Sequence, residues 1–508
     1  MAADDPYFQG VRSSWSTALR NAFGELPDPP WAADALPSPA QSSRRPMNTM
    51  RRITCLLLAS AALLLAARAL GARPAANDTA IASFVDDSLA RLLRYYQALH
   101  AAPELSHREE HTSKDLAREL RAAGYEVTER IGRYPGAALL GFGVVGVLRN
   151  GAGLTLLIRA DMDALPIQEQ IGLPCAGPRR VRNDAGDGSP VMRACGHDIH
   201  EIHDIHVTAL VGVARVMVHF QERWHGTLVL LGQPAEETID GALAMLRDGL
   251  YERIPKPDLV LALHDTAFIP AGAVGLTRGY ALATSTQMGV VVRGVGGHGS
   301  RPEDTKKPVA LAASIVIQLQ TIVRREISPF DQAVVTVGTN HGGTKRNIIA
   351  EEVKLELNIR AYKMAVREHV IQAVARIARA AALGAGVPED RLPLVSVIAT
   401  EYAPALYNDP ALTARLHPVF ERALGAPQVR AYPPIMASED VSNFSLDAKI
   451  PLLMFWLGAN SEARLAAAAQ SGVPFAGMHS SRFEPMPAPT LRTGVIAMSS
   501  AALEALHR

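Results

Sequence analysis

The chain has 508 residues, more than one hydrophobic core usually spans, so two domains with additional segments are expected. Its 51 lysine and arginine residues balance its 50 aspartate and glutamate residues, and no basic run interleaved with aromatic residues occurs, which argues against nucleic acid and leaves small molecules as expected partners. The three cysteines, Cys55, Cys175 and Cys195, are too few for a disulfide framework in a chain of this size.

The first 76 residues are interpreted as a leader followed by an export signal. Residues 1–46 show neither a helical nor a strand period and include a proline-rich run, typical of a disordered leader or of a start codon assigned too early. Residues 47–76 combine a basic start, an apolar run and small residues suited to cleavage, the layout of a signal peptide. Because Arg68 interrupts the apolar run, which is short for a membrane span, we predict cleavage, no stable membrane anchor, and a secreted or periplasmic protein.

The next segments indicate helices and buried strands. Residues 78–123 have a helical pattern, in which the polar stretch 103–112 is expected at the surface and at helix caps. The apolar runs at 142–148 and 154–159, bounded by glycine-rich turns, are predicted to be buried strands. The second run leads almost directly into the acidic stretch 161–163.

Two further strands also deliver ionisable side chains. The elements predicted after residue 200 are a helix at 207–222, a strand at 227–231, a helix at 243–250 and a strand at 258–263. The first of these strands is followed by Glu236 and Glu237, and the second runs straight into His264. Since active sites of open parallel sheets form at the carboxyl ends of the strands, these side chains are predicted to converge in an α/β catalytic domain with a mostly parallel sheet.

Cys195 and His197, which lie between the strands at 154–159 and 227–231, add two good ligands for zinc and its neighbours in the transition series. The single residue between them lets one turn present both side chains to one point. A buried thiol beside a capping Asp-His pair is the alternative for this tripeptide alone. The acidic and histidine-bearing strand ends around it favour a metal site.

From residue 285 the order of elements changes. Strand, helix, strand, strand, helix and strand are predicted at 287–293, 309–325, 333–338, 353–360, 367–383 and 393–400. This ferredoxin-like βαββαβ order predicts an α+β domain, 285–402, inserted between the two parts of the catalytic domain, 77–284 and 403–508. An exposed edge or helical face of the inserted domain could pair two subunits. The second catalytic part is predicted to contain a helix at 410–424, a strand at 451–457 and a loop with His479.

Five candidate metal ligands are too many for one tetrahedral zinc ion and fit two ions better. They are Cys195, His197, Glu237, His264 and His479. Two ions that share a bridging ligand, which could be the Cys195 thiolate, can hydrolyse an amide, because one polarises the carbonyl and both acidify a water. Glu236 is then predicted to take the proton of the water and return it to the leaving amine, although a solvated loop is the alternative for a Glu-Glu pair.

Seven short motifs occur along residues 78–508. They are ADMDALP (160–166), ACGHD (194–198), QPAEE (233–237), GGH (296–298), VGTNHGGTKRNIIA (337–350), SED (438–440) and GMH (477–479). With these motifs the chain resembles the dinuclear metallo-amidohydrolases, which include hippurate hydrolase, N-acyl-amino-acid amidohydrolases and auxin-conjugate hydrolases within the wider aminoacylase and carboxypeptidase family. The resemblance implies a zinc-peptidase-like catalytic domain with two divalent ions, which can be zinc, manganese, cobalt or nickel.

The resemblance also implies roles for individual residues. The five candidate ligands match the family's metal ligands, and Glu236 matches its general base. His298 would reach over the site from the second domain, often from the other subunit of a homodimer, and stabilise the oxyanion, with a turn histidine among glycines as the alternative. Asn347 and Arg360 would hold the substrate carboxylate, with a surface charge as the alternative for Arg360.

Further acids lie close to these motifs in the sequence. Asp163 is predicted to orient a metal ligand, and Asp161 is a second candidate for this role. Glu439 and Asp440 match the SED motif, but the sequence assigns them no role. Cys175 has no motif around it and is predicted to be structural.

The stretch after Cys195 departs from the family pattern. Residues 197–200, HDIH, recur as residues 203–206, so six residues are duplicated next to the predicted metal site. Six residues added to a helix lengthen it by about 9 Å and turn it by about 240°. Either the extra segment forms a loop that leaves the C-G-H tripeptide in place, or the site is distorted and activity falls. Cys195 and His197 of the tripeptide are kept as predicted metal ligands. The histidine that follows them in the family pattern is either His200 or His206.

Three functions from different classes are compatible with these features. The first is a secreted two-metal amidohydrolase that cleaves N-acyl or N-aroyl amino acids or dipeptide-like substrates. The second is a catalytically impaired relative that binds such ligands without cleaving them, because of the duplication. The third is an enzyme with Cys195 as nucleophile, which the sequence disfavours because it leaves Glu236, Glu237 and His264 without a role.

Overall fold

The described elements belong to one of two compact units. A computed structural model describes residues 76–135, 141–165, 180–182, 188–190, 203–446, 449–473, 475 and 482–507. The chain separates into units 1–73 and 74–508, and every described element lies in the second. The predicted leader and all but the last residue of the predicted signal peptide lie outside the described residues. Within the described residues, no helix is both long and apolar enough to cross a membrane.

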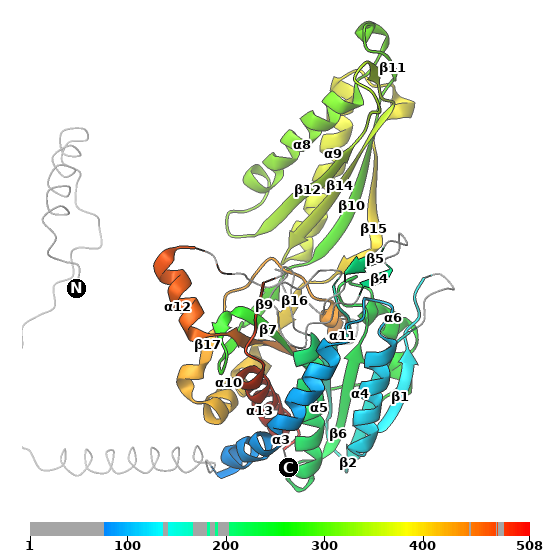
Figure 1. The fold of residues 1–508 in the computed structure, drawn as a ribbon. Helices are drawn as coiled ribbons and strands as arrows, with labels where there is room; N and C mark the ends of the chain where they lie inside the picture. The colour runs from blue at the N-terminus through cyan, green and yellow to red at the C-terminus, as the bar shows by residue number, and fades with distance from the viewer. Residues whose placement is uncertain are drawn as a thin grey trace, which may run out of the picture. The chain divides into compact units, whose positions relative to one another are not determined.

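The larger of the two main sheets has eight strands and is mostly parallel (Figure 1). In order across the sheet they are β1 (Glu126–Ile131), β2 (Gly143–Asn150), β6 (Gly226–Gln233), β3 (Thr155–Asp161), β7 (Leu259–Pro270), β18 (Leu452–Asn460), β8 (Val274–Leu276) and β17 (Val429–Ala431). The central strands β6, β3, β7 and β18 run parallel to one another. Their side chains are buried on both faces, which explains the continuous apolar runs in the sequence. The predicted mostly parallel sheet is confirmed.

Helices pack on both faces of this sheet. The helices of this part are α3 (Ala76–His100), α4 (Glu110–Ala122), α5 (His203–His219), α6 (Gly241–Arg247), α7 (Leu250–Arg253), α10 (Pro410–Leu424), α11 (Asn443–Leu446), α12 (Glu462–Ser471) and α13 (Pro487–Ala505). Because successive strand residues point to opposite faces, Leu156 and Ile158 of β3 join the core with α3, α5 and α13. Leu157 joins the core on the other face with residues of α6 and α11.

The strand predicted at 258–263 extends further in the structure. β7 continues through His264 to Pro270, because it pairs with parallel β18 along most of its length, with His264 opposite Trp456. His264 therefore lies within a strand, and its predicted position just past the strand end was wrong. The antiparallel edge strand β1 was not predicted, because polar residues fill its exposed positions.

The polar stretch 103–112 forms the break between α3 and α4 and is partly buried. The predicted surface position is wrong for Glu104 and Glu109, which are 7% and 0% exposed. The carboxylate of Glu104 accepts the backbone N–H of Thr112 at 2.9 Å and so caps the first turn of α4. Glu109 accepts the backbone N–H of the nearby His107 and that of Ala235, which lies far away in the sequence, and the local pattern contains no signal for this distant contact.

A second sheet has four antiparallel strands in the order β12-β14-β10-β15 (Figure 1). In chain order its elements are β10 (Ser285–Arg293), α8 (Pro308–Arg325), β12 (Ala333–His341), β14 (Glu352–Ala361), α9 (Met364–Gly384) and β15 (Leu394–Ala403). Residues of β14 alternate between exposed and buried positions, and the buried ones share a core with α8 and α9. Both helices therefore cover the same face of this sheet.

Short antiparallel pairs complete the described strands. They are β11 (Gly297–His298) with β13 (Ile348–Ile349), β9 (Gly279–Leu282) with β16 (Leu406–Asn408), and β4 (Arg180–Arg182) with β5 (Gly188–Pro190). The β11–β13 pair joins two segments that carry sequence motifs, GGH and the motif at 337–350.

Candidate metal centre

The loop after β6 is held by a buried carboxylate. Asp163 accepts the backbone N–H of Glu236 at Oδ1 and that of Glu237 at Oδ2, both at 3.0 Å. The hydroxyl of Ser106 donates to the same carboxylate at 2.6 Å. The last residues of the parallel strands β3 and β6 are register partners, so the loops that follow them start side by side. Asp163 thereby fixes the backbone from which both glutamate side chains project.

A second carboxylate holds the preceding residue of the loop. Oε1 of the buried Glu109 accepts the backbone N–H of Ala235 at 2.8 Å. Ala235 has a φ of 53°, a left-handed conformation that residues with a Cβ seldom adopt. Such strain persists only where the surroundings hold the backbone, as the two carboxylates do here. Burial raises the pKa of Glu109 well above its usual range, and the neighbouring Asp163 raises it further.

Glu236 is enclosed with two more acids. Its side chain is buried, and carboxylate oxygens of Glu236, Glu439 and Asp440 lie within 4.8 Å of one another. Burial raises the pKa of Glu236 well above its usual range, and the charges of Glu439 and Glu237 raise it further. A nearby cation would favour the ionised form that a general base needs.

Arg159 links the end of β3 to the SED motif. Its buried guanidinium donates from Nη2 to Oε1 of Glu439 at 2.8 Å and from Nη1 to Oε2 at 3.2 Å, a bidentate pair. It also lies 3.4 Å from Asp440 and 3.5 Å from Asp161. Burial alone would lower the pKa of Arg159, but Glu439 and Asp161 raise it, so the side chain stays charged. This residue was missed from the sequence, although a charge inside an apolar strand indicates a buried ion pair.

Two histidines lie beside the end of β3, one at the start of α5 and one within β7. Nδ1 of His206, in the first turn of α5, is 2.6 Å from Oδ1 of Asp161, and its Nε2 is 3.3 Å from Oδ1 of Asp265. The ring centroids of His206 and His264 are 5.0 Å apart. Burial alone would lower the pKa of His206, but Asp161 and Asp265 raise it to about 9. Asp161 and Asp265 engage the two ring nitrogens of His206, which favours His264 as the histidine ligand of this pair.

His264 is oriented by a backbone carbonyl. Its Nδ1 lies 2.8 Å from the carbonyl oxygen of Asp265, which assigns the ring proton to Nδ1 and the lone pair to Nε2. Nε2 is therefore the atom that can bind a metal ion. A hydrogen bond from the other ring nitrogen is the usual way in which proteins fix a metal-binding imidazole.

The buried charges of this region fit divalent cations. Seven carboxylates of this region with at most 1% exposure are Glu109, Asp161, Asp163, Glu236, Asp265, Glu439 and Asp440. Among the described residues that contact them, the buried cationic side chains are Arg159 and His206. Buried charges are normally paired or bound to metal ions, so the excess of carboxylates over cations suits added positive charge. The mixture of imidazole and carboxylate donors suits zinc and its neighbours in the transition series.

The structure describes two of the five predicted metal ligands. Glu237 and His264 lie at the same edge of the large sheet, on either side of β3. A continuous series of contacts runs through His264, Asp265, His206, Asp161, Arg159 and Glu439. Cys195, His197 and His479 lie outside the described residues, so their roles stay predictions.

The β11–β13 pair brings His298 and Asn347 together. His298 is the register partner of Ile348, and the N–H of Gly299 donates to the carbonyl of Asn347 at 2.9 Å. The His298 side chain is exposed, and its Nδ1 accepts the N–H of Ser300 at 3.2 Å. The ring proton is therefore assigned to Nε2, which leaves an N–H donor of the kind that stabilises an oxyanion.

Arg360 lies at the opposite end of β14 from Asn347. It donates from Nε to Oδ1 of Asn358 and from Nη1 to the carbonyl of Met436, both at 2.8 Å. β14 begins at Glu352, after Asn347, and the eight steps from Glu352 to Arg360 span about 26 Å at about 3.3 Å per residue. Asn347 and Arg360 of one chain are therefore too far apart to hold the same small substrate.

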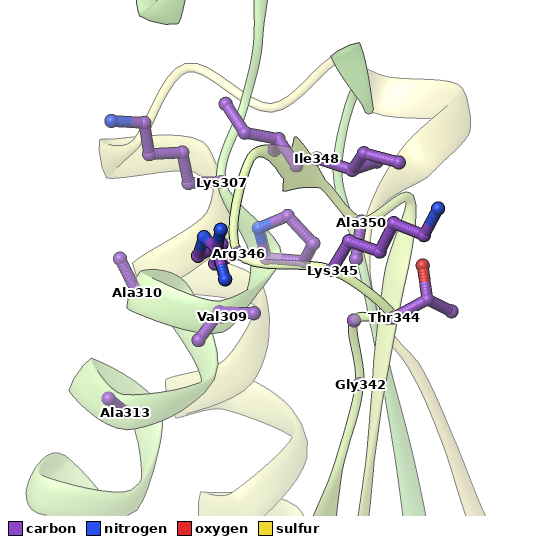
Figure 2. Close-up of a pocket in the computed structure, with 13 residues that line it drawn as sticks. Lys307, Val309, Ala310, Ala313, Gly342, Thr344, Lys345, Arg346, Ile348 and Ala350 are labelled. Atoms are coloured by element: carbon purple, nitrogen blue, oxygen red, sulfur yellow. The ribbon is translucent and has the colours of Figure 1, made fainter. Parts of the chain in front are cut away.

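A pocket of about 680 Å³ is lined by residues that precede and follow Asn347 in the chain (Figure 2). The first turn of α8 forms one side and the loop 342–350 forms the other. Its lining includes the basic Lys307, Lys345 and Arg346 and the partly exposed apolar Val309 and Ile348. No acidic residue lines the pocket, so its described lining carries net positive charge.

The sequence and the fold are similar to those of known proteins. The model of peptidase family M20/M25/M40 matches residues 157–473. Hippurate hydrolase of Campylobacter jejuni is 32% identical over 348 residues, which cover 68% of this chain and 82% of that protein. The crystal structure of a protein from methicillin resistant Staphylococcus aureus has a TM-score of 0.71 at 26% identity, and the match covers 84% of this chain and 100% of that one.

Another solved structure shows the same fold at lower identity. A Bacillus subtilis protein, described as a dinuclear metal binding peptidase from the M20 family, has a TM-score of 0.64 at 24% identity, and the match covers 83% of this chain and 99% of that one. The chain belongs to peptidase family M20/M25/M40. It is accordingly a metal-dependent enzyme that hydrolyses amide bonds. The resemblance drawn from the seven motifs is confirmed.

Proposed function

We propose that the protein hydrolyses the amide bond of N-acyl or N-aroyl amino acids, or of dipeptide-like substrates, with two divalent metal ions. The observation that carries this proposal is the buried Glu236, held beside Glu237 through backbone bonds to Asp163, at the same sheet edge as His264. The similarity to a hippurate hydrolase supports the substrate class, because hippurate is an N-aroyl amino acid.

The two ions would be held by residues from several loops and strands. The proposed ligands are Glu237 and His264 together with Cys195, His197 and His479. Once bound, the ions would polarise the amide carbonyl and lower the pKa of the attacking water. The excess of buried carboxylates and the lone pair on Nε2 of His264 support this assignment. Zinc, manganese, cobalt and nickel all accept such ligands.

Glu236 then acts first as general base and afterwards as general acid. It removes a proton from the attacking water and returns it to the nitrogen of the leaving amine as the C–N bond breaks, so a carboxylate and an amine are released. Added positive charge would offset the effect of Glu439 and Glu237 on Glu236 and keep its carboxylate ionised. The Nε2–H of His298 would donate to the developing oxyanion.

We further propose that residues 285–402 form a ferredoxin-like lid through which two copies pair. The separation of Asn347 from Arg360 along β14 supports pairing, because one substrate can meet both only if they come from different copies. Arg360 of one copy would then hold the substrate carboxylate together with Asn347 from the other, and His298 of that other copy would stabilise the oxyanion. The positively charged pocket between α8 and the loop 342–350 would attract anionic substrates.

Export is proposed from the signal-like composition of residues 47–76. The mature enzyme would then be secreted or periplasmic. Expression of the full chain with separation of cell and medium or periplasm tests this, since the exported form should begin close to residue 73. A full-length product that stays in the cytoplasm would contradict it.

Metal analysis combined with a substrate panel tests the reaction itself. The wild type should carry two divalent ions per chain and cleave at least one of hippurate, N-acetyl amino acids and dipeptides. Glu236→Gln should keep both ions and lose about 10²- to 10⁴-fold in kcat, the usual contribution of a general base. The exposed Glu222→Gln is the matched control and should leave kcat unchanged. A metal-loaded wild type that cleaves no member of the panel would refute the proposal.

A further inference from the structure

The duplicated HDIH segment raises the question of which copy serves the site. The second copy, residues 203–206, opens α5. Its Asp204 and His206 are 0% and 1% exposed, so both polar side chains are buried in the protein. Buried polar side chains are costly without partners, and therefore their contacts indicate their role.

Asp204 anchors the start of α5 to the end of α3. Its Oδ2 lies 3.3 Å from Nδ1 of His100, the last residue of α3, and both side chains are at most 1% exposed. The ring of His100 stacks on that of Tyr96, with centroids 5.9 Å apart. The acid of the second copy therefore has a buried partner on a different helix.

His206 bridges the carboxyl end of β3 and the middle of β7. Its Nδ1 meets Asp161 at the end of β3, and its Nε2 meets Asp265 within β7, next to His264. Nε2 is 3.3 Å from the carboxylate of Asp265 and 3.2 Å from its backbone nitrogen. A protonated ring donates to the carboxylate and a neutral ring accepts from the N–H, so the contact at Nε2 is Asp265 in either state.

Asp265 connects His206 to His264. Its backbone carbonyl accepts the Nδ1–H of His264 at 2.8 Å, the bond that turns Nε2 of His264 toward metal binding. His206 therefore holds the residue that orients His264. Since six residues turn a helix by about 240°, one register of α5 brings only one copy of the repeat into these buried positions.

We infer that His206 of the second copy is a positioning residue for the metal ligand His264, acting through Asp265, and that the six extra residues precede Asp204 and are dispensable. This inference rests on the proposed two-metal function. It also selects His206, from the two candidates His200 and His206, as the histidine that follows the C-G-H tripeptide in the family pattern.

The repeat supplies its own control, because each residue of the second copy has an identical residue in the first. Titration of the metal-free full chain with Co²⁺, followed by the visible absorption of the bound ion, measures affinity without an activity assay. His206→Asn should weaken Co²⁺ binding by about 10- to 100-fold, the usual cost of losing a residue that orients a ligand. His200→Asn should bind Co²⁺ as the wild type does.

A conservative substitution separates positioning from a general loss of stability. The amide of asparagine occupies the place of Nδ1 and faces Asp161, whereas the amide of glutamine reaches the place of Nε2 and faces Asp265. His206→Gln should therefore recover part of the Co²⁺ affinity that His206→Asn loses. Equal affinities for these two folded variants would overturn the route through Asp265. If His206→Asn does not fold, the Co²⁺ affinity of His206→Gln is compared with that of His200→Gln. Equal affinities of these two variants would overturn the inference.

Deletion of residues 198–203 tests the second half of the inference. It joins His197 directly to Asp204 and leaves one HDIH copy, and the shortened full chain should bind Co²⁺ with unchanged affinity. Loss of Co²⁺ binding on deletion, or on His200→Asn, would show that the first copy is required. A wild type that binds Co²⁺ but hydrolyses no panel substrate would refute the proposed function alone, since the titrations would still test the role of His206.

Discussion

Single carboxylates that hold backbone amides determine where the catalytic side chains of this site point. Asp163 binds the amides of Glu236 and Glu237, and Glu109 binds that of Ala235, so three successive residues are fixed by two buried acids. Both acids therefore serve to hold the loop, because each carboxylate accepts backbone N–H groups from it. The two acids have different consequences, one for metal binding and one for stability.

Asp163→Asn should impair metal binding and catalysis while the fold persists. The carboxylate accepts an N–H at each oxygen, but an asparagine amide has one oxygen, so its NH₂ group would face the second N–H of the loop. We expect a loss of about 10- to 100-fold in metal affinity and in kcat/KM. The exposed Asp87→Asn serves as control. Metal content and kinetics equal to those of the wild type would show that the loop does not depend on this carboxylate.

Glu109 should make stability depend on pH. Its pKa is higher in the folded protein than the unfolded value of about 4.3, so its contribution to stability is fully present below that value and is lost as the pH rises through the raised pKa. Glu109→Gln keeps an oxygen for the N–H of Ala235 and removes the charge. The variant should therefore have a higher Tm than the wild type at pH 8, with a smaller difference at pH 5.

Thermal unfolding of Glu109→Gln from pH 5 to pH 8 measures this effect. The neighbouring Glu110→Gln is the matched control, because Glu110 is exposed and pairs with Lys114 at the surface. Its Tm difference from the wild type should be small throughout this range. A Tm difference for Glu109→Gln that does not vary with pH would mean that the pKa of Glu109 is unperturbed.

At the scale of elements, the end of β3 and the SED segment depend on one guanidinium. Arg159→Met should destabilise the protein by about 3–5 kcal/mol, because it leaves the buried Glu439 and its neighbour Asp440 without their cation. Arg149→Met removes the exposed pair with Glu126 and should cost about 0–1 kcal/mol. Urea unfolding measures both. Similar values for the two variants would show that Arg159 is not required for stability.

The elements also show what a sequence can reveal. The strands around the site were predictable because parallel strands buried on both faces leave continuous apolar runs, and α10 begins and ends at the predicted residues. The end of β7 was not predictable, because pairing with β18 determines how far it extends. The predicted strand ends identified Glu236, Glu237 and His264 as site candidates, and the QPAEE motif contains the two glutamates.

The residues that support the site were harder to find. Glu109 and Ser106 belong to a polar segment whose partners lie far away in the chain, so its local pattern resembles a surface loop. The repeat offered two equivalent histidines, and only the contacts of His206 with Asp161 and Asp265 distinguish them. No observation on the described residues favours the catalytically impaired relative, and the Cys195 nucleophile falls outside them.

At the scale of the whole molecule, the proposed pairing of copies can be tested by mixing two inactive variants. Asn347→Ala removes the proposed contact with the substrate carboxylate, and Glu236→Gln removes the general base. Subunit exchange between them should restore activity, because a mixed dimer holds one site with an intact base and an intact Asn347. Mixtures that stay as inactive as the separate variants would show that each site is built from a single chain.

The length of β14 has a practical consequence for measuring this enzyme. If Arg360 and Asn347 meet only across two copies, a separated subunit retains its general base and its metal ligands. It loses the contact between the substrate and Asn347 of the other copy. Turnover per chain should then fall on dilution, mainly through a higher KM, and recover on concentration. A rate per chain that stays constant down to nanomolar protein would indicate self-sufficient subunits.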